Sequence, residues 1–143
     1  MRVQRGFSLI ELLIVVTVIG ILAVVAVPNL LKSKAAANEA SAIASVRTIV
    51  TAQITYSATV GSGSYAADLA ALEAAGLIDS VLAGGSKDGY AFVTVGAGDT
   101  FTVNADPTDM GSSGDRGFFS DESAVIRFAQ GAAADAGSPP LGG

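Results

Sequence analysis

GFSLIELLIVVTVIGILAVVAV, residues 6–27, is a strongly apolar stretch near the start of this 143-residue chain. A helix rises about 1.5 Å per residue, so about 20 residues cross the roughly 30 Å hydrocarbon core of a bilayer. Residues 12–27 carry no charge, and Arg2 and Arg5 precede the stretch. Because basic residues beside a span favour the cytoplasmic side, the stretch predicts a membrane-spanning helix with the rest of the chain outside the cytoplasm.

One acid, Glu11, interrupts the apolar stretch. A carboxylate is costly in lipid, so an acid at this place is a candidate for function. The apolar run is longer than the roughly 7–15-residue core of a secretory signal peptide, and no A-x-A-like cleavage site ends it. The change from a polar leader to apolar sequence lies instead at Gly6–Phe7. Hydropathy alone also fits a plain single-pass anchor, because membrane helices tolerate Gly and Pro.

Residues 1–28, MRVQRGFSLIELLIVVTVIGILAVVAVP, resemble the N-terminus of type IV pilins and of the related type II secretion pseudopilins, with a class III prepilin leader. The matching features are Gly6-Phe7, Glu11, Gly20 and Pro28. The resemblance covers residues 5–31 closely. It implies cleavage after Gly6 by a prepilin peptidase and N-methylation of the new amine of Phe7. It also implies that Glu11 pairs with the Phe7 amine of a neighbouring subunit during assembly.

Helical patterning continues beyond the apolar stretch. Residues 30–59 are rich in Ala and contain no Gly and no Pro, which favours a helix. Residues at spacings of three and four form one stripe, namely Glu39, Ile43, Val46, Val50 and Ile54. The pattern predicts a single helix from Phe7 to about Thr59, whose second half packs on a globular domain.

Two residues are expected to weaken this helix. Pro28 cannot donate a hydrogen bond to the preceding turn and its ring crowds that turn, so a kink is expected there. Gly20 costs about 1 kcal/mol relative to Ala in a helix. The family resemblance implies that residues 20–28 loosen when subunits pack, and an ordinary tolerated kink is the alternative.

The rest of the chain predicts a small sheet. Residues 90–95 and 100–105 alternate as strands of a hairpin, and residues 117–120 and 124–128 form a second. Residues 66–75 predict a short helix. The fold class is therefore α+β, with a long N-terminal helix packed on a small antiparallel β-sheet, as in the type IV pilin-like fold. The expected parts are a leader (1–6), a transmembrane and assembly helix (7–29), a globular domain (30–128) and a flexible tail (129–143).

Composition limits the chemistry that the chain can perform. It has no Cys and no His, which excludes disulfides, His-ligated zinc and the common catalytic triads. No enzyme activity is expected, and the excess of 13 acidic over 8 basic residues disfavours direct nucleic-acid binding. Oxygen ligands for Ca²⁺ are available in loop-like sequence at Asp106, Asp109, Asp115, Asp121 and Glu122. Their spacing fails the EF-hand pattern, and solvated acidic loops are the usual alternative, so no cofactor is expected beyond a candidate Ca²⁺.

These observations favour a structural subunit of a type IV pilus-like filament. The resemblance implies a precursor in the bacterial inner membrane, assembly by dedicated machinery and a homo-oligomeric helical filament at the cell surface. Adhesion, twitching motility and DNA uptake are the outputs it allows. One alternative is a type II secretion pseudopilin that acts in protein export. Another is a membrane-anchored binding protein that never polymerises.

Overall fold

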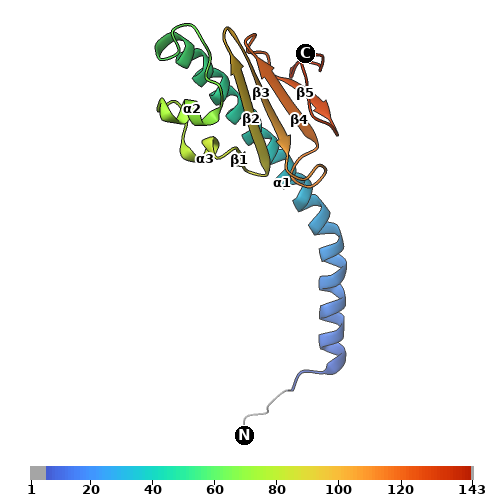
Figure 1. Ribbon diagram of the computed structural model, residues 1–143. Coiled ribbons are helices and arrows are strands. Elements are labelled where there is room, and N and C mark those ends of the chain that lie inside the picture. The colour runs from blue at the N-terminus through green and yellow to red at the C-terminus, as the bar shows by residue number, and fades with distance from the viewer. Residues whose placement is uncertain (1–5, 143) are drawn as a thin grey trace. The chain divides into compact units, whose positions relative to one another are not determined.

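The computed structural model describes residues 6–142, and its longest element is helix α1 (Leu9–Thr59) (Figure 1). The predicted long helix is confirmed, and it starts two residues after Phe7. The helix runs through Pro28 without interruption, so the kink at Gly20 and Pro28 stays a prediction. The chain forms two compact units, with the boundary between Ser33 and Lys34.

The second unit contains a five-stranded sheet in which each strand pairs antiparallel with the next in the chain. The strands are β1 (Ser86–Lys87), β2 (Tyr90–Ala97), β3 (Thr100–Pro107), β4 (Arg116–Asp121) and β5 (Arg127–Gln130). Both predicted hairpins are confirmed. The last strand begins at Arg127, later than predicted, because Ala124 closes the turn with a positive φ of 58° and donates to the carbonyl of Asp121.

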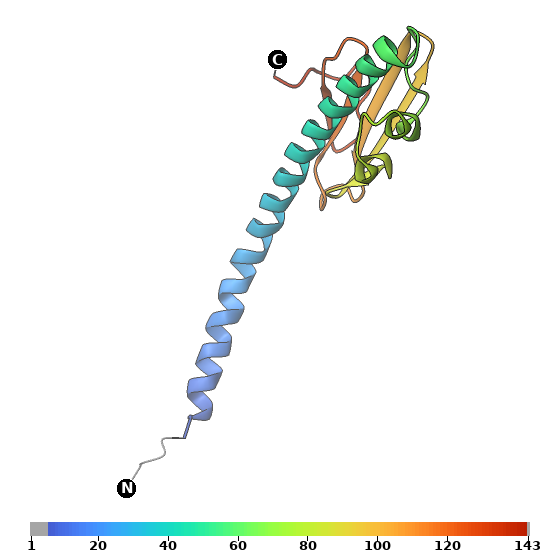
Figure 2. The same ribbon diagram turned by 90° about the vertical axis from the view of Figure 1, so that its left-hand side faces the viewer.

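One face of the sheet packs against the part of α1 that lies in this unit (Figure 2). Alternate residues of β2 and β3 point toward the helix and are buried, as period-two strands require. The largest fully buried apolar side chains are Tyr90, Phe101, Phe118, Ile49, Leu72, Val46 and Val103. The core of the domain is therefore a two-layer helix-on-sheet core.

The buried stripe of α1 is rotated from the predicted one. Val46 and Val50 are buried as expected, but Ile54 is 47% exposed. The buried residues of α1 are Ala35, Glu39, Ala42, Ser45, Val46, Ile49, Val50, Ala52 and Gln53. The predicted stripe contained Glu39 but not Gln53. The structure buries the polar Glu39 and Gln53 because other segments supply their hydrogen bonds.

Two short helices, α2 (Leu69–Ala74) and α3 (Ser80–Ala83), connect α1 to the sheet. Each is capped by an aspartate whose side chain accepts from the helix backbone, Asp68 in α2 and Asp79 in α3. The predicted short helix is confirmed with narrower bounds, and its Leu69 and Leu72 are buried.

The tail differs from the expectation of a flexible segment without a role in the core. Leu141 packs against the core, and its amide donates to the carbonyl of Ile126 at 2.7 Å. Ala134 is buried, and its carbonyl accepts from the side chain of Asn104 on the outer face of β3. Small residues suit this role because they let the tail lie flat against the sheet.

Candidate functional site

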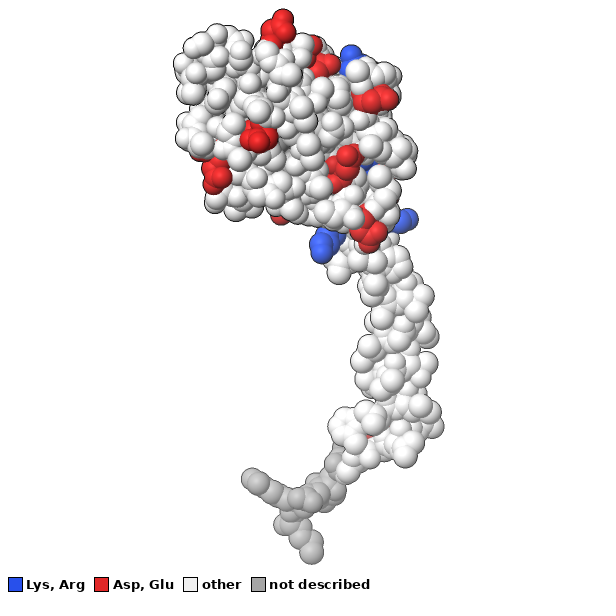
Figure 3. Space-filling model, viewed as in Figure 1, with Lys and Arg blue, Asp and Glu red and all other residues white. Residues whose placement is uncertain are grey.

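The first compact unit exposes an apolar helical surface. One helix of the described chain is long and apolar enough to cross a membrane, and none of its apolar window is buried. Its exposed large side chains include Phe7, Leu9, Ile10, Leu12, Leu13, Ile14, Val15, Val16, Val18, Ile19, Ile21, Leu22, Val24, Val25 and Val27. This helical surface is almost free of charge, whereas acidic residues are scattered over the globular domain (Figure 3). An apolar surface of this extent requires cover by lipid or by protein.

The predicted processing junction lies just before this helix. Gly6 and Phe7 are exposed and non-helical, and the Phe7 side chain is 82% exposed. The helix starts where the carbonyl of Ser8 accepts from the amides of Glu11 and Leu12, at 3.1 and 3.2 Å. An exposed, non-helical bond between Gly6 and Phe7 is open to a peptidase. The leader residues before Gly6 lie outside the described residues.

Glu11 stands in the first turn of α1, and its side chain is exposed. The partial positive charge at a helix N-terminus stabilises an acid at this position. The one salt bridge within residues 6–142 joins two other side chains, so a single chain offers Glu11 no described cation. A carboxylate that enters an apolar environment in this state needs a partner from another molecule. The predicted pairing with the Phe7 amine of a neighbour stays a prediction.

The globular unit contains an ion pair that was not predicted from the sequence. Glu39 on α1 contacts the first residue of β4, with 2.7 Å between its Oε2 and Nη2 of Arg116. The same Oε2 accepts from Nε of Arg116 at 2.8 Å, and Oε1 accepts from the amide of Asp115 at 2.8 Å. Glu39 is buried, and the guanidinium also lies over the rings of Phe118 and Phe128. An acid within an otherwise apolar helical stripe is the signal that could have revealed this pair.

Tyr90 lies beside this ion pair. Its ring is fully buried, and its hydroxyl donates to the carbonyl of Arg116 at 2.8 Å. Burial, together with the nearby charge of Glu39, raises the pKa of Tyr90 far above its ordinary value. The phenol therefore stays neutral and acts as a structural donor, which gives no indication of acid–base chemistry.

Gln53 makes a second polar connection inside the core. It is fully buried, and its amide group donates to the carbonyl of Ala66 and to the hydroxyl of Thr94, both at 3.0 Å. Its oxygen accepts from the amide of Ala66 at 2.8 Å. Gln53 therefore fixes α1 to both the connecting loop and β2. Its role was not predicted from the sequence, because a single Gln in a helix forms no recognisable motif.

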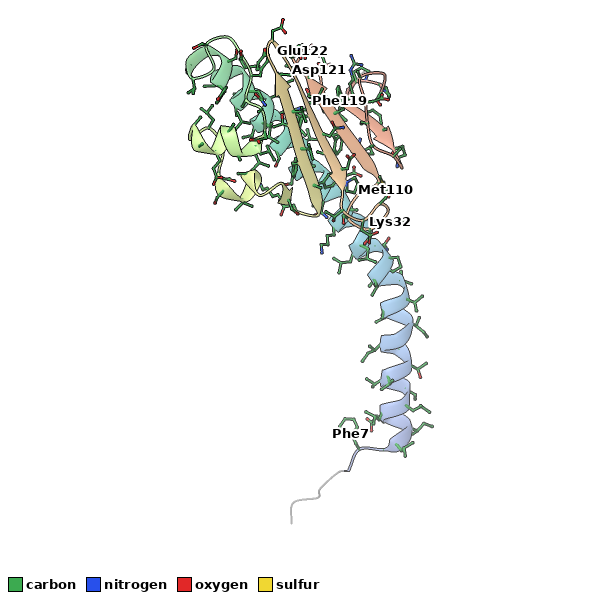
Figure 4. All side chains as sticks on the ribbon, viewed as in Figure 1. Phe7, Lys32, Met110, Phe119, Asp121 and Glu122 are labelled. Atoms are coloured by element: carbon green, nitrogen blue, oxygen red, sulfur yellow. The ribbon has the colours of Figure 1, made fainter. Side chains whose placement is uncertain are left out.

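The candidate calcium ligands do not converge. No group of three acidic side chains in residues 6–142 is arranged to hold a metal ion. Asp121 and Glu122 lie at one end of the sheet, and Met110, next to Asp109 in the chain, lies at the other end (Figure 4). The carboxylate of Asp121 accepts from the amide of Ser123 and so closes the turn between β4 and β5.

The stretch Gly61–Ala66 lies in the turn between α1 and α2, and its letters match the G-x-G-x-x-A pattern. The backbone amide and carbonyl of its last residue, Ala66, are both bound by Gln53. The stretch follows a helix and no parallel sheet is present in the described chain, so its G-x-G-x-x-A letters do not form a dinucleotide site.

Comparison with known proteins identifies a known motif at the N-terminus of this chain, in the segment that contains the start of α1. Residues 1–27 match the prokaryotic N-terminal methylation motif. The type IV wide pilus major component PilA4 of Thermus thermophilus is 33% identical over 131 residues, which are 87% of this chain and 93% of that protein.

Two further relatives match over about a third of this chain. The type IV major pilin protein PilA of Myxococcus xanthus is 48% identical over 50 residues, 35% of this chain and 23% of that protein. The type II secretion system core protein G of Vibrio cholerae is 46% identical over 46 residues, 32% of each chain. No solved structure gives a significant match. With a long match to a pilus component and the methylation motif at its N-terminus, this chain belongs to the type IV pilin and pseudopilin family.

Proposed function

We propose that this chain is a structural subunit of a type IV pilus-like filament and has no catalytic role. The observation that carries the proposal is the exposed apolar surface of Phe7 and of α1 from Leu9 to Val27, which a single chain leaves uncovered. In the precursor, lipid covers this surface. In the filament, the same surface of other copies covers it, so the helix moves from a bilayer into a bundle.

The proposal includes a defined processing route. The precursor is held in the bacterial inner membrane, a prepilin peptidase cleaves after Gly6, and the new amine of Phe7 is methylated. The match of residues 1–27 with the methylation motif supports both steps. Glu11 then pairs with the Phe7 amine of a neighbouring copy, because a carboxylate buried in a bundle must be neutralised. The partners are other copies of the chain and the assembly machinery, with no direct binding of nucleic acid.

A pseudopilin of type II secretion is the second candidate. Matches to core protein G from three bacteria support it, but they cover only 30%, 32% and 32% of this chain. The match to a pilus component covers 87% of the chain and therefore includes the globular domain. Because the match to a pilus component is the longer one, the pilus subunit is preferred.

The test is mass spectrometry of the N-terminus on protein sheared from the cell surface. We expect a peptide that begins at N-methylated Phe7, recovered from filaments. An intact Met1, with no protein in the sheared fraction, would contradict processing and polymerisation together. Deletion of the chain separates the two candidates: loss of surface filaments supports the pilus subunit, and loss of protein export with filaments retained supports the pseudopilin.

A substitution at Glu11 separates a filament subunit from a plain anchor. Glu11→Gln should abolish filaments while the protein stays in the membrane, because the amide cannot neutralise a buried amine. Glu122→Gln is the matched control, since Glu122 is an exposed acid in the turn before β5. Filaments formed by the Glu11→Gln chain at the control level would contradict the role of Glu11 in assembly. A plain anchor would form no filaments with or without the substitution and would stay in the membrane in both cases.

No cofactor is part of the proposal. Calcium is tested by thermal unfolding of the detergent-solubilised chain with added Ca²⁺ and with a chelator. Equal unfolding temperatures support a chain without a calcium site. A rise with Ca²⁺ that is lost in the Asp121→Asn variant would instead assign a site to the β4–β5 turn.

A further inference from the structure

The globular unit leaves one face of α1 without a covering element. We call it the threonine face, and it consists of the exposed residues Arg47, Thr48, Thr51 and Ile54, with the half-buried Thr55 beside them. A groove of about 500 Å³ borders it on one side and is otherwise lined by residues such as Val125 and Leu141. A groove of about 320 Å³ borders the other side. Arg47 and Thr51 line both grooves, so the face forms a ridge between two hollows.

The hydroxyls of this face have partners within the helix. Thr48 donates to the carbonyl of Ala44 at 3.1 Å, Thr51 to that of Arg47 at 2.9 Å, and Thr55 to that of Thr51 at 2.8 Å. A polar group that keeps its hydrogen bond loses little when it is removed from water. The face can therefore be buried against an apolar partner at low cost.

Apolar side chains on and beside the face are exposed. Ile54 is 47% exposed, and Val125 across the larger groove is 39% exposed. In a lone domain these side chains remain in contact with water, although they adjoin a hollow that a partner could fill. An apolar helix fits this description, because it would bury both side chains and need no hydrogen bonds from the face.

The charged residues indicate which apolar helix the threonine face binds. Arg47 is the one charged residue among those that line the two grooves, and it takes part in no salt bridge within residues 6–142. Glu11 is the one charged residue in residues 6–31, and it too has no salt bridge in that part of the chain. A guanidinium and a carboxylate that both lack an ion-pair partner within residues 6–142 of a single chain are complementary.

We propose that the threonine face binds the apolar helix of a second copy of this chain, with Arg47 of one copy paired to Glu11 of the other. This inference rests on the proposed function and specifies the surface through which the subunits meet. The carboxylate of Glu11 has two oxygens, so it accepts from Arg47 as well as from the Phe7 amine. Each copy thereby receives a neighbour's helix and offers its own.

The pairing fixes the register of the two helices. Copies inserted in the same orientation run parallel, so equal steps from the ion pair stay opposite each other. Four residues on, Val15 of one copy lies opposite Thr51 of the other, and seven residues on, Val18 lies opposite Ile54. The contact therefore places branched apolar side chains of one helix against methyl groups of the other.

Cysteine crosslinking of intact filaments tests this register directly. The chain has no native Cys, so a Val15→Cys, Thr51→Cys double variant carries the only thiols. A disulfide requires Cα atoms about 4.4–6.8 Å apart, so it reports close contact. We expect oxidation to produce a ladder of covalent oligomers, because each copy links to two others. The single variants should give dimers at most. The double variant Val15→Cys, Thr100→Cys should give no ladder, because Thr100 lies in the β2–β3 hairpin and outside the threonine face.

Filaments of the double variant that show no ladder would overturn the inference while leaving the proposed function intact. Failure of the unaltered chain to form filaments would contradict the proposed function itself, and the inference with it. Preparing the unaltered chain and the double variant side by side therefore distinguishes the two failures.

Charge reversal provides a second test that applies even where the cysteine variant fails to assemble. Arg47→Glu places two acids together, and we expect the yield of filaments to fall at least about tenfold. The unfolding temperature of the membrane-held chain should not change, because Arg47 is exposed and unpaired in the lone domain. Arg47→Lys should retain most filaments.

Lys34→Glu is the matched control, an exposed reversal on the same helix outside both grooves. Loss of filaments with Arg47→Glu but not with Lys34→Glu supports the pairing. Equal yields from the two variants, whether high or low, would overturn a specific role for Arg47.

Discussion

The carboxylate of Glu39 joins α1 to β4 through Arg116, with 2.7 Å between the charged groups. The side chain of Glu39 is 11% exposed and that of Arg116 is 31% exposed, so the pair is shielded from water on one side. Its second oxygen also holds the amide of Asp115, which places the loop before β4 against the helix. A helix and a strand that are far apart in the sequence are thereby fixed by one side chain.

Removal of either partner should destabilise the domain. We expect Glu39→Ala to lower the free energy of unfolding by about 2 kcal/mol, because it leaves the guanidinium and the amide of Asp115 without their acceptor. Arg116→Ala should cost a similar amount, since it leaves a buried carboxylate unpaired. Chemical unfolding of the detergent-solubilised chain, followed by circular dichroism, measures both.

The double variant is the control for this pair. If the two side chains act through each other, the combined loss should be smaller than the sum of the single losses by about 0.5–3 kcal/mol. Additive losses would show that the contact contributes little and that each substitution acts on its own surroundings.

Gln53→Leu should destabilise the domain more than an exposed substitution of the same kind. The variant leaves the amide and carbonyl of Ala66 buried without a partner, and each such group costs about 1–3 kcal/mol. Gln130→Leu at the exposed end of β5 is the matched control, expected within about 0.5 kcal/mol of the parent. Thermal unfolding of the two variants decides, and equal unfolding temperatures would contradict a structural role for Gln53.

Asp106 should make stability depend on pH. Its Oδ1 is buried and has no hydrogen-bond partner among residues 6–142, and burial raises its pKa above the ordinary 3.8. The folded chain therefore binds this proton more tightly than the unfolded chain, so its contribution to stability is present at low pH and is lost as the pH rises from 3.8 through the raised pKa. Asp106→Asn stays neutral and should avoid this loss.

The comparison to make is the unfolding temperature of parent and variant across the acidic to neutral range. The unfolding temperature of the Asp106→Asn variant should rise relative to that of the parent as the pH rises. This difference should level off once Asp106 of the parent is ionised. Asp109→Asn, at an exposed position, should show no such trend. A constant difference between Asp106→Asn and the parent at all pH values would disprove the linkage.

Gly117→Ala should release the C-terminal segment from the sheet. A Cβ at this position would lie 2.6 Å from the carbonyl oxygen of Ala132 and 2.7 Å from Oδ1 of Asp106. One of them must move, at a cost of about 1–3 kcal/mol. Limited proteolysis should then cleave the tail faster, whereas Gly137→Ala, whose Cβ would meet its nearest neighbour at 3.4 Å, should behave as the parent does.

Local sequence rules accounted for α1, α2 and strands β2 to β5, whereas the short elements α3 and β1 were not predicted. Apolar content and alanine predicted α1 nearly to its ends, because helix propensity and periodicity act within a few residues. Alternating residues on both sides of residues 96–99 predicted the β2–β3 hairpin. The structure shortens the connection to the two-residue turn Gly98-Asp99, which sets the register. The processing junction and Glu11 were likewise evident, because the motif that contains them is continuous in the sequence.

What the sequence determined by itself is therefore the apolar helix, its terminal motif and the two hairpins formed by β2 to β5. The tertiary structure alone decided which face of α1 is buried, since Glu39 and Gln53 become core residues only when Arg116 and Ala66 arrive from elsewhere in the chain. It also decided that the small residues of the tail cover the sheet, because they pack on a surface that the strands form only in the folded domain. Both outcomes depend on groups distant in sequence, and the free energy of burying a polar or small residue is set by the partners that meet it there.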